Sequence, residues 1–451
     1  MKRLLVANRG EIALRIVRAA RDLGIETVAV HSEADAGAAH VRLADSALPI
    51  GPSPVGKSYL RADGIIEAAL ESGADAVHPG YGFLAERADF ARACQAAGLT
   101  FVGPDADVID RMGDKVAALV AADEAGVPIV PGSDGPVADA DAAAGAAASL
   151  GYPVMLKAAG GGGGRGIRVV ADESELRRDF PMASGEAGAA FGDPRLYVES
   201  FVTRARHVEV QVLGDGDDVV HLYERECSLQ RRRQKVVEEA LSPGIAPAVR
   251  ESMTAAAVAL CRSVGYRSAG TVEFLVVDDT GAFYFIEMNT RIQVEHPVTE
   301  LLCGVDLVAE QLRIAAGDGL RLAQGDISTR GAAIELRVNA EDPANGFFPS
   351  PGHIERLRLP AGPWVRVDTG LEAGADVTPF YDSLLAKVIV WGADRAEALQ
   401  RARRCLGEFE VDGVRTTVPL LSAILREDWF ADARFHTGTL EQWLETNPLV
   451  S

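Results

Sequence analysis

The sequence predicts a mixed α/β (α+β) protein with a parallel sheet at its start and a β-rich region at its end. A strand–helix–strand pattern opens the chain and repeats, a strand near 152–158 enters five consecutive glycines, and strands alternate with helices after residue 204. At roughly 100–200 residues per domain, a chain of 451 residues suits two to four domains. We expect three, at 1–113, 114–330 (with a small lid at about 131–203) and 331–451.

The first domain is predicted from the opening of the chain. Residues 3–7 form an apolar run typical of a buried strand, and Asn8-Arg9-Gly10 turns the chain into a helix at 11–23 that Gly24 ends. A second strand follows at 27–31. This order predicts a Rossmann-like parallel sheet that binds ligands at the carboxyl ends of its strands. The alternation continues at 65–70, 76–78, 90–97 and 101–102.

The composition disfavours several classes of protein. Acidic residues number 65 and basic residues 45, and the resulting net charge of −20 argues against binding to nucleic acid. No apolar run approaches the roughly 20 residues of a membrane helix, and the basic and apolar start is too short for a signal peptide. The five cysteines form no C-x-x-C pair, which argues against a disulfide framework or a zinc site. We expect a cytoplasmic protein that binds neither nucleic acid nor a membrane.

A glycine-rich loop follows the predicted strand at 152–158. Lys157 lies shortly before five glycines, residues 160–164, and Arg165 follows them. Glycine lets backbone N–H groups approach phosphate oxygens closely, and a lysine adds positive charge. No Gly-Lys-Ser/Thr follows, so the run is not a P-loop. A mobile lid over a triphosphate fits best, because strands lead into and out of the loop, and a flexible linker is the alternative.

A predicted hairpin places two carboxylates opposite one another. Residues 278–281 have the composition of a turn. Paired residue numbers in an antiparallel hairpin have a constant sum, so a turn centred near residue 280 pairs Glu273 with Glu287. Facing carboxylates repel each other, and a divalent cation reverses that penalty. Asn289 faces the same way, and this set of oxygen ligands suits Mg²⁺ or Mn²⁺.

The polar residues that continue from this hairpin are all odd-numbered: Glu287, Asn289, Arg291, Gln293 and Glu295. If the segment is extended, one face presents acid, amide, cation, amide and acid in turn. A solvent-facing strand is the usual explanation of such alternation. The facing pair of carboxylates favours a functional site instead.

Two further segments have more than one interpretation. Residues 207–212 alternate polar and apolar side chains, which is typical of an ordinary amphipathic strand. Residues 224–235 concentrate cations in an acidic protein, and a solvated face and an anion pocket explain them equally well. Cys227, within this run, is more typical of a structural cysteine than of a nucleophile.

Together these motifs resemble the biotin carboxylases, which are ATP-grasp enzymes, along essentially the whole chain. The matching segments occur in one order: Ala7-Asn-Arg-Gly-Glu-Ile-Ala13, His78-Pro-Gly-Tyr-Gly-Phe83, Met112-Gly-Asp-Lys115, the glycine loop, Gln230-Arg-Arg232, Gln234-Lys-Val-Val-Glu-Glu239, the run from Glu287 to Glu300, Glu341-Asp-Pro343 and Tyr381-Asp-Ser383. The resemblance implies a Rossmann-like N-terminal domain, an ATP-grasp core with its lid, and a β-rich C-terminal domain. The carbamoyl-phosphate synthase large chain, a relative, is much longer and duplicated.

The resemblance also implies roles for individual residues. ATP phosphates would be held by Lys115, Lys157 and the loop glycines Gly162, Gly163 and Gly164. The adenine pocket would be lined by Glu199 to Val202, with His207 and Gln230 nearby. Two Mg²⁺ or Mn²⁺ ions would be bound by Glu273, Glu287 and Asn289. Bicarbonate would be bound by Lys235, Arg291, Gln293 and the Val294 backbone, with Glu295 as the base. Arg337 would stabilise the biotin enolate, and Arg233 departs from the family, in which many members have His.

The implied reaction is the ATP-dependent carboxylation of biotin N1 by bicarbonate through carboxyphosphate. It is the first half-reaction of a carboxylase such as acetyl-CoA carboxylase in fatty acid biosynthesis. The implied partners are a biotin carboxyl carrier protein, carboxyltransferase subunits and a second copy of the chain in a homodimer. None of the six lysines lies between two methionines, as a carrier lysine usually does, so we expect biotin on a separate chain. Another ATP-grasp ligase and a catalytically silent scaffold are the alternatives.

Overall fold

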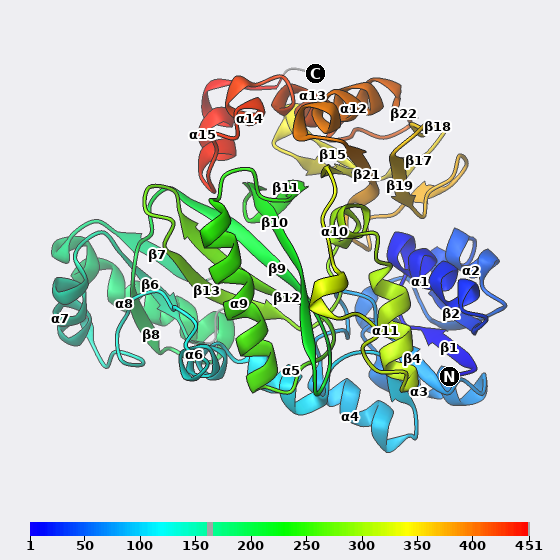
Figure 1. Cartoon of the computed structure of the whole chain (residues 1–451), viewed down its shortest axis with the longest axis horizontal. Coiled ribbons are helices and arrows are strands. Elements are labelled where there is room, and N and C mark those ends of the chain that lie inside the picture. The colour runs from blue at the N-terminus through cyan, green and yellow to red at the C-terminus, as the bar shows by residue number, and fades with distance from the viewer. Residues whose placement is uncertain (160–165, 450–451) are drawn as a thin grey trace.

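The computed structural model describes residues 1–159 and 166–449, and the chain is built around one large sheet (Figure 1). The N-terminal region lies at one side of this sheet, the predicted lid at the other, and the C-terminal region above it in the view of Figure 1. Within the described residues, no helix is long and apolar enough to cross a membrane.

The N-terminal region is a five-stranded parallel sheet, as predicted. Its strand order is β3-β2-β1-β4-β5, and each neighbouring pair is parallel. Gly24 ends α1 with a φ of 72°, a left-handed conformation that glycine adopts without steric penalty. The elements are β1 (Arg3–Val6), α1 (Gly10–Asp22), β2 (Glu26–Ser32), α2 (Ala39–Leu43), β3 (Ser46–Gly51), α3 (Ala62–Glu71), β4 (Ala76–His78), α4 (Ala88–Ala96), β5 (Thr100–Phe101) and α5 (Ala106–Gly113).

Helix α6 (Lys115–Glu124) leads into the lid, which has a small sheet of its own. Its strand order is β7-β6-β8, both pairs are antiparallel, and α7 and α8 contact these strands. The predicted strand starts at Val154 and not at Tyr152, because Pro153 has no N–H to donate to a ladder. The lid elements are α7 (Ala140–Leu150), β6 (Val154–Ala158), β7 (Ile167–Val170), α8 (Glu173–Phe191) and β8 (Leu196–Ser200).

An eight-stranded antiparallel sheet joins the middle of the chain to its C-terminal region. Its order is β13-β12-β9-β10-β11-β14-β21-β19. Strand β14 pairs with β11, so the boundary expected near residue 330 falls within one continuous sheet. The three-domain division stays a prediction. The strands are β9 (Ala205–Asp215), β10 (Val219–Arg231), β11 (Gln234–Ala240), β12 (Arg267–Val277), β13 (Phe283–Asn289), β14 (Ala332–Asn339), β19 (Val365–Thr369) and β21 (Leu384–Gly392).

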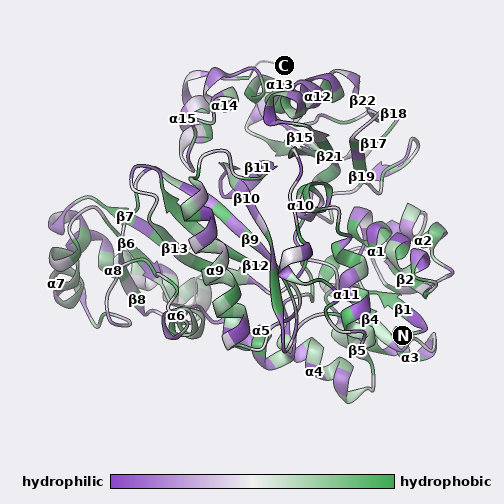
Figure 2. Ribbon diagram, in the orientation of Figure 1, coloured by the Kyte–Doolittle hydropathy of each residue, from purple (hydrophilic) through white to green (hydrophobic). Residues whose placement is uncertain are grey.

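Helices cover both faces of this sheet. Helix α9 (Pro247–Ser263) contacts β9 and β10, α10 (His296–Cys303) contacts β14 and β10, and α11 (Leu307–Ala316) contacts β12. Hydrophilic and hydrophobic residues alternate around α9 and along the strands beside it (Figure 2).

The C-terminal region is β-rich up to residue 392 and then mainly helical, with one further strand. Three short antiparallel pairs accompany the large sheet: β15 (Glu341–Asp342) with β16 (Phe348–Pro349), β17 (Gly352–His353) with β20 (Asp376–Val377), and β18 (Arg356–Arg358) with β22 (Glu410–Asp412). The helices are α12 (Arg395–Glu408), α13 (Val418–Ile424), α14 (Asp428–Ala431) and α15 (Thr439–Thr446).

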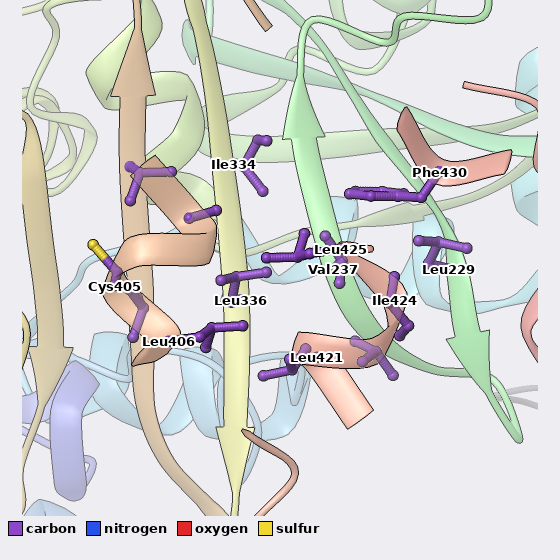
Figure 3. Packing of buried hydrophobic residues seen from close by; sticks show 14 of the residues in the cluster. Leu229, Val237, Ile334, Leu336, Cys405, Leu406, Leu421, Ile424, Leu425 and Phe430 are labelled. Carbon is purple, nitrogen blue, oxygen red and sulfur yellow. The ribbon is translucent and has the colours of Figure 1, made fainter. Parts of the chain in front are cut away.

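A hydrophobic cluster locks the C-terminal helices onto the sheet. Leu229 of β10, Val237 of β11 and Leu336 of β14 pack with Leu406 of α12 and Leu421 of α13, and all are buried (Figure 3). The cluster therefore spans the predicted boundary between the middle and C-terminal regions. It fixes the cavity-facing residues of β14 from the opposite side of the sheet.

We predict that Leu336→Ala lowers the free energy of unfolding by about 2–5 kcal/mol, because it removes buried methyl groups and leaves a cavity. Leu336 is 0% exposed, whereas Leu43 is 41% exposed and serves as the matched control. Leu43→Ala should change stability by less than about 0.5 kcal/mol. Urea unfolding measures both, and equal midpoints for the two variants would show that Leu336 does not support this junction.

Candidate active site

A cavity of about 850 Å³ lies where the N-terminal region, the lid, the large sheet and the C-terminal region meet. Apart from Ser200 in the segment from Glu199 to Val202, the predicted site residues within the described ranges line it: Lys115, Lys157, Glu199, Phe201, Val202, His207, Gln230, Lys235, Glu273, Glu287, Asn289, Arg291, Gln293, Val294, Glu295 and Arg337. Gly162, Gly163 and Gly164 lie outside the described residues. Residues separated by more than 200 positions in the sequence are thus brought to one wall.

The predicted carboxylate pair is present in the β12–β13 hairpin. Glu273 pairs with Glu287, and Thr271 pairs with Asn289. Nearer the turn the register shifts by one, because Phe274 pairs with Phe285 and leaves Ile286 as the extra residue of a β-bulge. Next to the turn the paired residue numbers sum to 559 and not to 560, so the turn is centred at 279.5 and not at 280. The extra residue at Ile286 brings the sum back to 560, and Glu273 therefore pairs with Glu287 as predicted.

The two paired carboxylates differ in their surroundings. Burial alone raises the pKa of Glu273, but Lys235 and His207 outweigh burial and hold that pKa below its ordinary value. Burial and the negative charge of Glu273 both raise the pKa of Glu287, and Lys115 offsets this only in part. A carboxylate disfavoured by its neighbour gains from a cation between them.

The oxygen donors fit a divalent cation of the Mg²⁺ type. Glu273 and Glu287 provide carboxylates, and Asn289 adds an amide next to them. Two other acidic groups are close enough to hold a metal, His207–Glu209–Glu273 and Glu209–Cys227–Glu295. Lys235 contacts every carboxylate of these two groups, whereas Glu287 has no ion-pair partner among the described residues and its pKa is raised by burial and by Glu273. The Glu273–Glu287 pair is therefore the stronger metal candidate.

The polar series from Glu287 to Glu295 is not one extended strand. The expectation that its members share one face of a strand, which depended on an extended segment, is therefore corrected. Strand β13 ends at Asn289, residues 290–295 form a bend, and α10 begins at His296. Pro297 near the start of α10 favours the helix, because its missing N–H is not needed there. The bend nevertheless brings Gln293 and Glu295 to the cavity.

Two cations converge on Glu295. Lys235 Nζ lies 2.6 Å from Glu295 Oε1, and Arg337 Nη2 lies 3.0 Å from Glu295 Oε2. Burial alone raises the pKa of Glu295, but these two cations dominate and hold it well below its ordinary value. Arg337 also contacts Glu238 at 2.6 Å, and burial raises the pKa of Glu238 to about 7.

Arg225 is a central residue that the sequence did not reveal. Its side chain is 0% exposed and lies 2.6 Å from Glu209. Its guanidinium donates to Glu209, Gln211, Thr271, Gln293 and Thr299. The amphipathic-strand interpretation of 207–212 is wrong, because residues 208–212 are all buried. The solvated-face interpretation is wrong for residues 224–229, which are buried, and it holds for residues 232–234, which are exposed.

The end of the cavity beside the lid contains lysines, an imidazole and an amide. Lys157 pairs with Glu199 across β6 and β8. Burial lowers the pKa of Lys115, while Glu287 opposes that shift. Gln230 lies 2.7 Å from His207 Nδ1, so the two residues expected near adenine are neighbours.

Arg291 is held by a residue of the N-terminal region. Its Nε donates to Glu86 at 2.9 Å, and its Nη2 donates to the Asn289 side-chain oxygen at 2.9 Å. Glu86 also accepts from the Thr290 N–H at 3.2 Å. No sequence motif pointed to Glu86, because an isolated glutamate near Phe83 has no distinguishing pattern.

Family models match most of the chain in three consecutive segments. They are described as the biotin carboxylase N-terminal domain (residues 1–109), the carbamoyl-phosphate synthase L chain ATP-binding domain (114–323) and the biotin carboxylase C-terminal domain (335–442). This order is the one that the motifs indicated.

Individual proteins match along the same length. The chain is 54% identical to the biotin carboxylase of Pseudomonas aeruginosa (98% of this chain, 99% of the relative) and 50% identical to a pyruvate carboxylase subunit of Methanothermobacter thermautotrophicus (98% and 90%). It superimposes with a TM-score of 0.92 and 51% identity on the biotin carboxylase domain dimer of Hydrogenobacter thermophilus 2-oxoglutarate carboxylase, solved with MgADP, ADP and bicarbonate (98% of this chain, 97% of that one). For the Campylobacter jejuni biotin carboxylase–β,γ-ATP complex the TM-score is 0.93 at 41% identity, with 98% of each chain covered. The chain belongs to the biotin carboxylase family of ATP-dependent ligases.

Proposed function

We propose that this chain carboxylates N1 of biotin carried on a separate protein, using ATP and bicarbonate, through carboxyphosphate. The observation that carries the proposal is the convergence of Lys235 and Arg337 on Glu295 beside the Glu273–Glu287 pair. This arrangement provides cations for two anionic reactants, a carboxylate for proton transfer and a metal site within one cavity.

The nucleotide binds at the lid end of the cavity in this proposal. Lys115, Lys157 and the glycines Gly162, Gly163 and Gly164 hold the phosphates. The adenine pocket is lined by Glu199 to Val202, with His207 and Gln230 nearby. Glu273, Glu287 and Asn289 hold two Mg²⁺ or Mn²⁺ ions, whose charge neutralises the phosphates. The Hydrogenobacter relative was solved in complex with MgADP, which supports this assignment.

Bicarbonate binds between the metal site and Arg337. Lys235, Arg291, Gln293 and the Val294 backbone hold the anion, and Glu295 takes its proton as it attacks the γ-phosphorus of ATP. The same relative was solved in complex with bicarbonate, which supports a site for this anion in the cavity. Carboxyphosphate hydrolyses readily, so closure of the lid over the cavity protects it from water.

Biotin enters on the side of the C-terminal region. Carboxyphosphate yields CO₂ and phosphate. Phosphate, or Glu295 once it has passed on the bicarbonate proton, takes the proton from the ureido N1, and N1 then bonds to the carbon of CO₂. Arg337 stabilises the resulting enolate through its guanidinium. The same side chain touches Glu295 at 3.0 Å, so proton transfer and enolate stabilisation occur next to each other.

The chain works with partners in this proposal: a biotin carboxyl carrier protein, carboxyltransferase subunits and a second copy in a homodimer. Two relatives are themselves subunits of larger enzymes, a pyruvate carboxylase and a 2-oxoglutarate carboxylase, which supports assembly with other chains. The Hydrogenobacter relative was solved as a domain dimer, which supports the homodimer. These relatives name different carboxyl acceptors, and acetyl-CoA for fatty acid biosynthesis is a further candidate.

The decisive test measures ADP release by the purified chain with free biotin. We expect release to require bicarbonate and to increase with biotin. Arg337→Ala should lower the biotin-dependent rate about 100-fold or more, because it removes the donor to the enolate. The KM for ATP should change less than about twofold, because Arg337 is not assigned to ATP.

Arg404→Ala is the matched control, since Arg404 lies on α12 and is 41% exposed. Its rate should equal that of the wild type. ADP release independent of bicarbonate would contradict the proposed function. An equal loss of ATP affinity in Arg337→Ala would contradict the role of Arg337.

The metal assignment predicts the behaviour of Glu287→Gln, which keeps the size of the side chain and removes its charge. The Mg²⁺ concentration for half-maximal rate should rise at least about tenfold, and turnover should fall. Glu408→Gln changes a glutamate of α12 whose side chain is 44% exposed, and it should leave both quantities unchanged. Titration of the rate with Mg²⁺ measures the effect, and a wild-type titration curve for Glu287→Gln would refute the shared site.

A further inference from the structure

Lys387 is a fully buried lysine in the middle of β21, with 0% of its side chain exposed. Lysine is almost never fully buried unless it is paired, because its ammonium loses hydration. Its Nζ donates to the Val294 carbonyl oxygen at 2.9 Å, lies 3.1 Å from Glu11 and lies 3.8 Å from Asp368. One ammonium therefore joins the bend before α10 to helix α1 and to strand β19.

Lys387 lies beside Arg337 in the sheet. The two residues are cross-strand partners between β21 and β14. Arg337 contacts the side chain of Glu295, and Lys387 binds the carbonyl of the residue before it. Neighbouring cations thus hold two successive residues of the bend.

His296 binds the carbonyl of Gln293, the residue before Val294, in the same way. Its Nδ1 lies 2.7 Å from the Gln293 carbonyl oxygen, and it is the donor because a carbonyl oxygen only accepts. His296 is 0% exposed, and burial holds its pKa well below the ordinary value, so the ring is neutral. The carbonyl groups of Gln293 and Val294 are therefore both bound by buried side chains.

Because the peptide unit is planar, binding the carbonyls of Gln293 and Val294 also fixes the directions of the N–H groups of Val294 and Glu295. In a trans peptide the carbonyl and the following N–H point in opposite directions, and the cis bonds of the described residues lie elsewhere, before Pro153 and Leu241. The N–H groups of Val294 and Glu295 therefore point away from the side chains of His296 and Lys387 that bind these carbonyls, and both Val294 and Glu295 line the cavity. Among the described residues, neither N–H has a hydrogen-bond acceptor.

We propose that Lys387 is a positioning residue for bicarbonate: it holds the Val294 carbonyl so that the N–H groups of Val294 and Glu295 face the bound anion. Successive N–H groups on one side of the backbone form an anion-binding concavity. The inference rests on the proposed function, which places bicarbonate at this bend. Lys387 lies behind the cavity wall and acts through the main chain.

A purely structural role for Lys387 makes a different prediction. Lys387→Met removes both the bond to Val294 and the positive charge that Glu11 needs. Glu11→Gln removes the charge on Glu11 and leaves Lys387 bound to Val294. Asp368 is also bound by Arg366 at 2.6 Å, so it does not depend on Lys387 alone for a cation. In the double variant Lys387→Met/Glu11→Gln the hydrogen bond to Val294 is lost, but no unpaired charge is left on Glu11. Any effect that it shares with Lys387→Met therefore comes from the lost hydrogen bond.

The test measures initial rates of ATP cleavage with free biotin while bicarbonate and ATP are varied in turn. Lys387→Met should raise the KM for bicarbonate about tenfold, because a hydrogen bond from a charged donor is lost. The KM for ATP should change less than about twofold, since the nucleotide residues lie elsewhere. The double variant should show the same rise, and Glu11→Gln alone should show less than about a twofold rise.

Lys57→Met applies the same substitution to an exposed lysine and should leave every constant unchanged. A wild-type bicarbonate KM in the double variant would overturn the inference, and so would parallel rises in both KM values. If Lys387→Met does not fold, the double variant decides the question. Its Glu11→Gln change removes the buried carboxylate that Lys387→Met alone would leave without its cation. A wild-type chain without bicarbonate-dependent cleavage overturns the proposed function together with this inference. An active wild type with unchanged bicarbonate KM in the variants overturns this inference alone.

Discussion

The wall of the cavity depends on one constraint: every charge buried in the large sheet needs a partner. Moving an ion from water into a protein costs several kcal/mol even after the protein relaxes. Arg225 and Lys235 share Glu209, and Lys235 and Arg337 share Glu295. Because each carboxylate serves two cations, a side chain that moves leaves a buried charge unpaired. The network therefore fixes the positions of the residues that line the cavity.

The same pairing controls the proposed base. While Lys235 and Arg337 hold Glu295, its pKa lies well below the ordinary value, and such a carboxylate is a weak base. Bicarbonate and the biotin enolate draw on these two cations in the proposed mechanism. Each contact that moves from Glu295 to a substrate weakens the stabilisation of its carboxylate and raises its pKa. The arrival of substrates thus increases the basicity of Glu295 where it is needed.

Local patterns in the sequence were sufficient to predict the parallel N-terminal sheet and the pairing of Glu273 with Glu287. They could not predict the bulge at Ile286, because no glycine or other residue typical of a bulge lies between Phe283 and Asn289. They also missed Arg225, since its isolated position in a cationic run has no pattern of its own. Its importance comes from the burial of both faces of β9 and β10, which only the assembled sheet reveals.

The continuous sheet also determines which parts of the site keep fixed distances. Glu287 lies on β13 and Arg337 on β14, and an unbroken series of paired strands runs between them. Backbone hydrogen bonds along this series hold Glu287 and Arg337 at a set separation. Within the described residues, the lid has its own sheet and shares no strand with the large one. In the proposed mechanism the lid therefore controls access for nucleotide, while the sheet sets the spacing between phosphoryl transfer and biotin carboxylation.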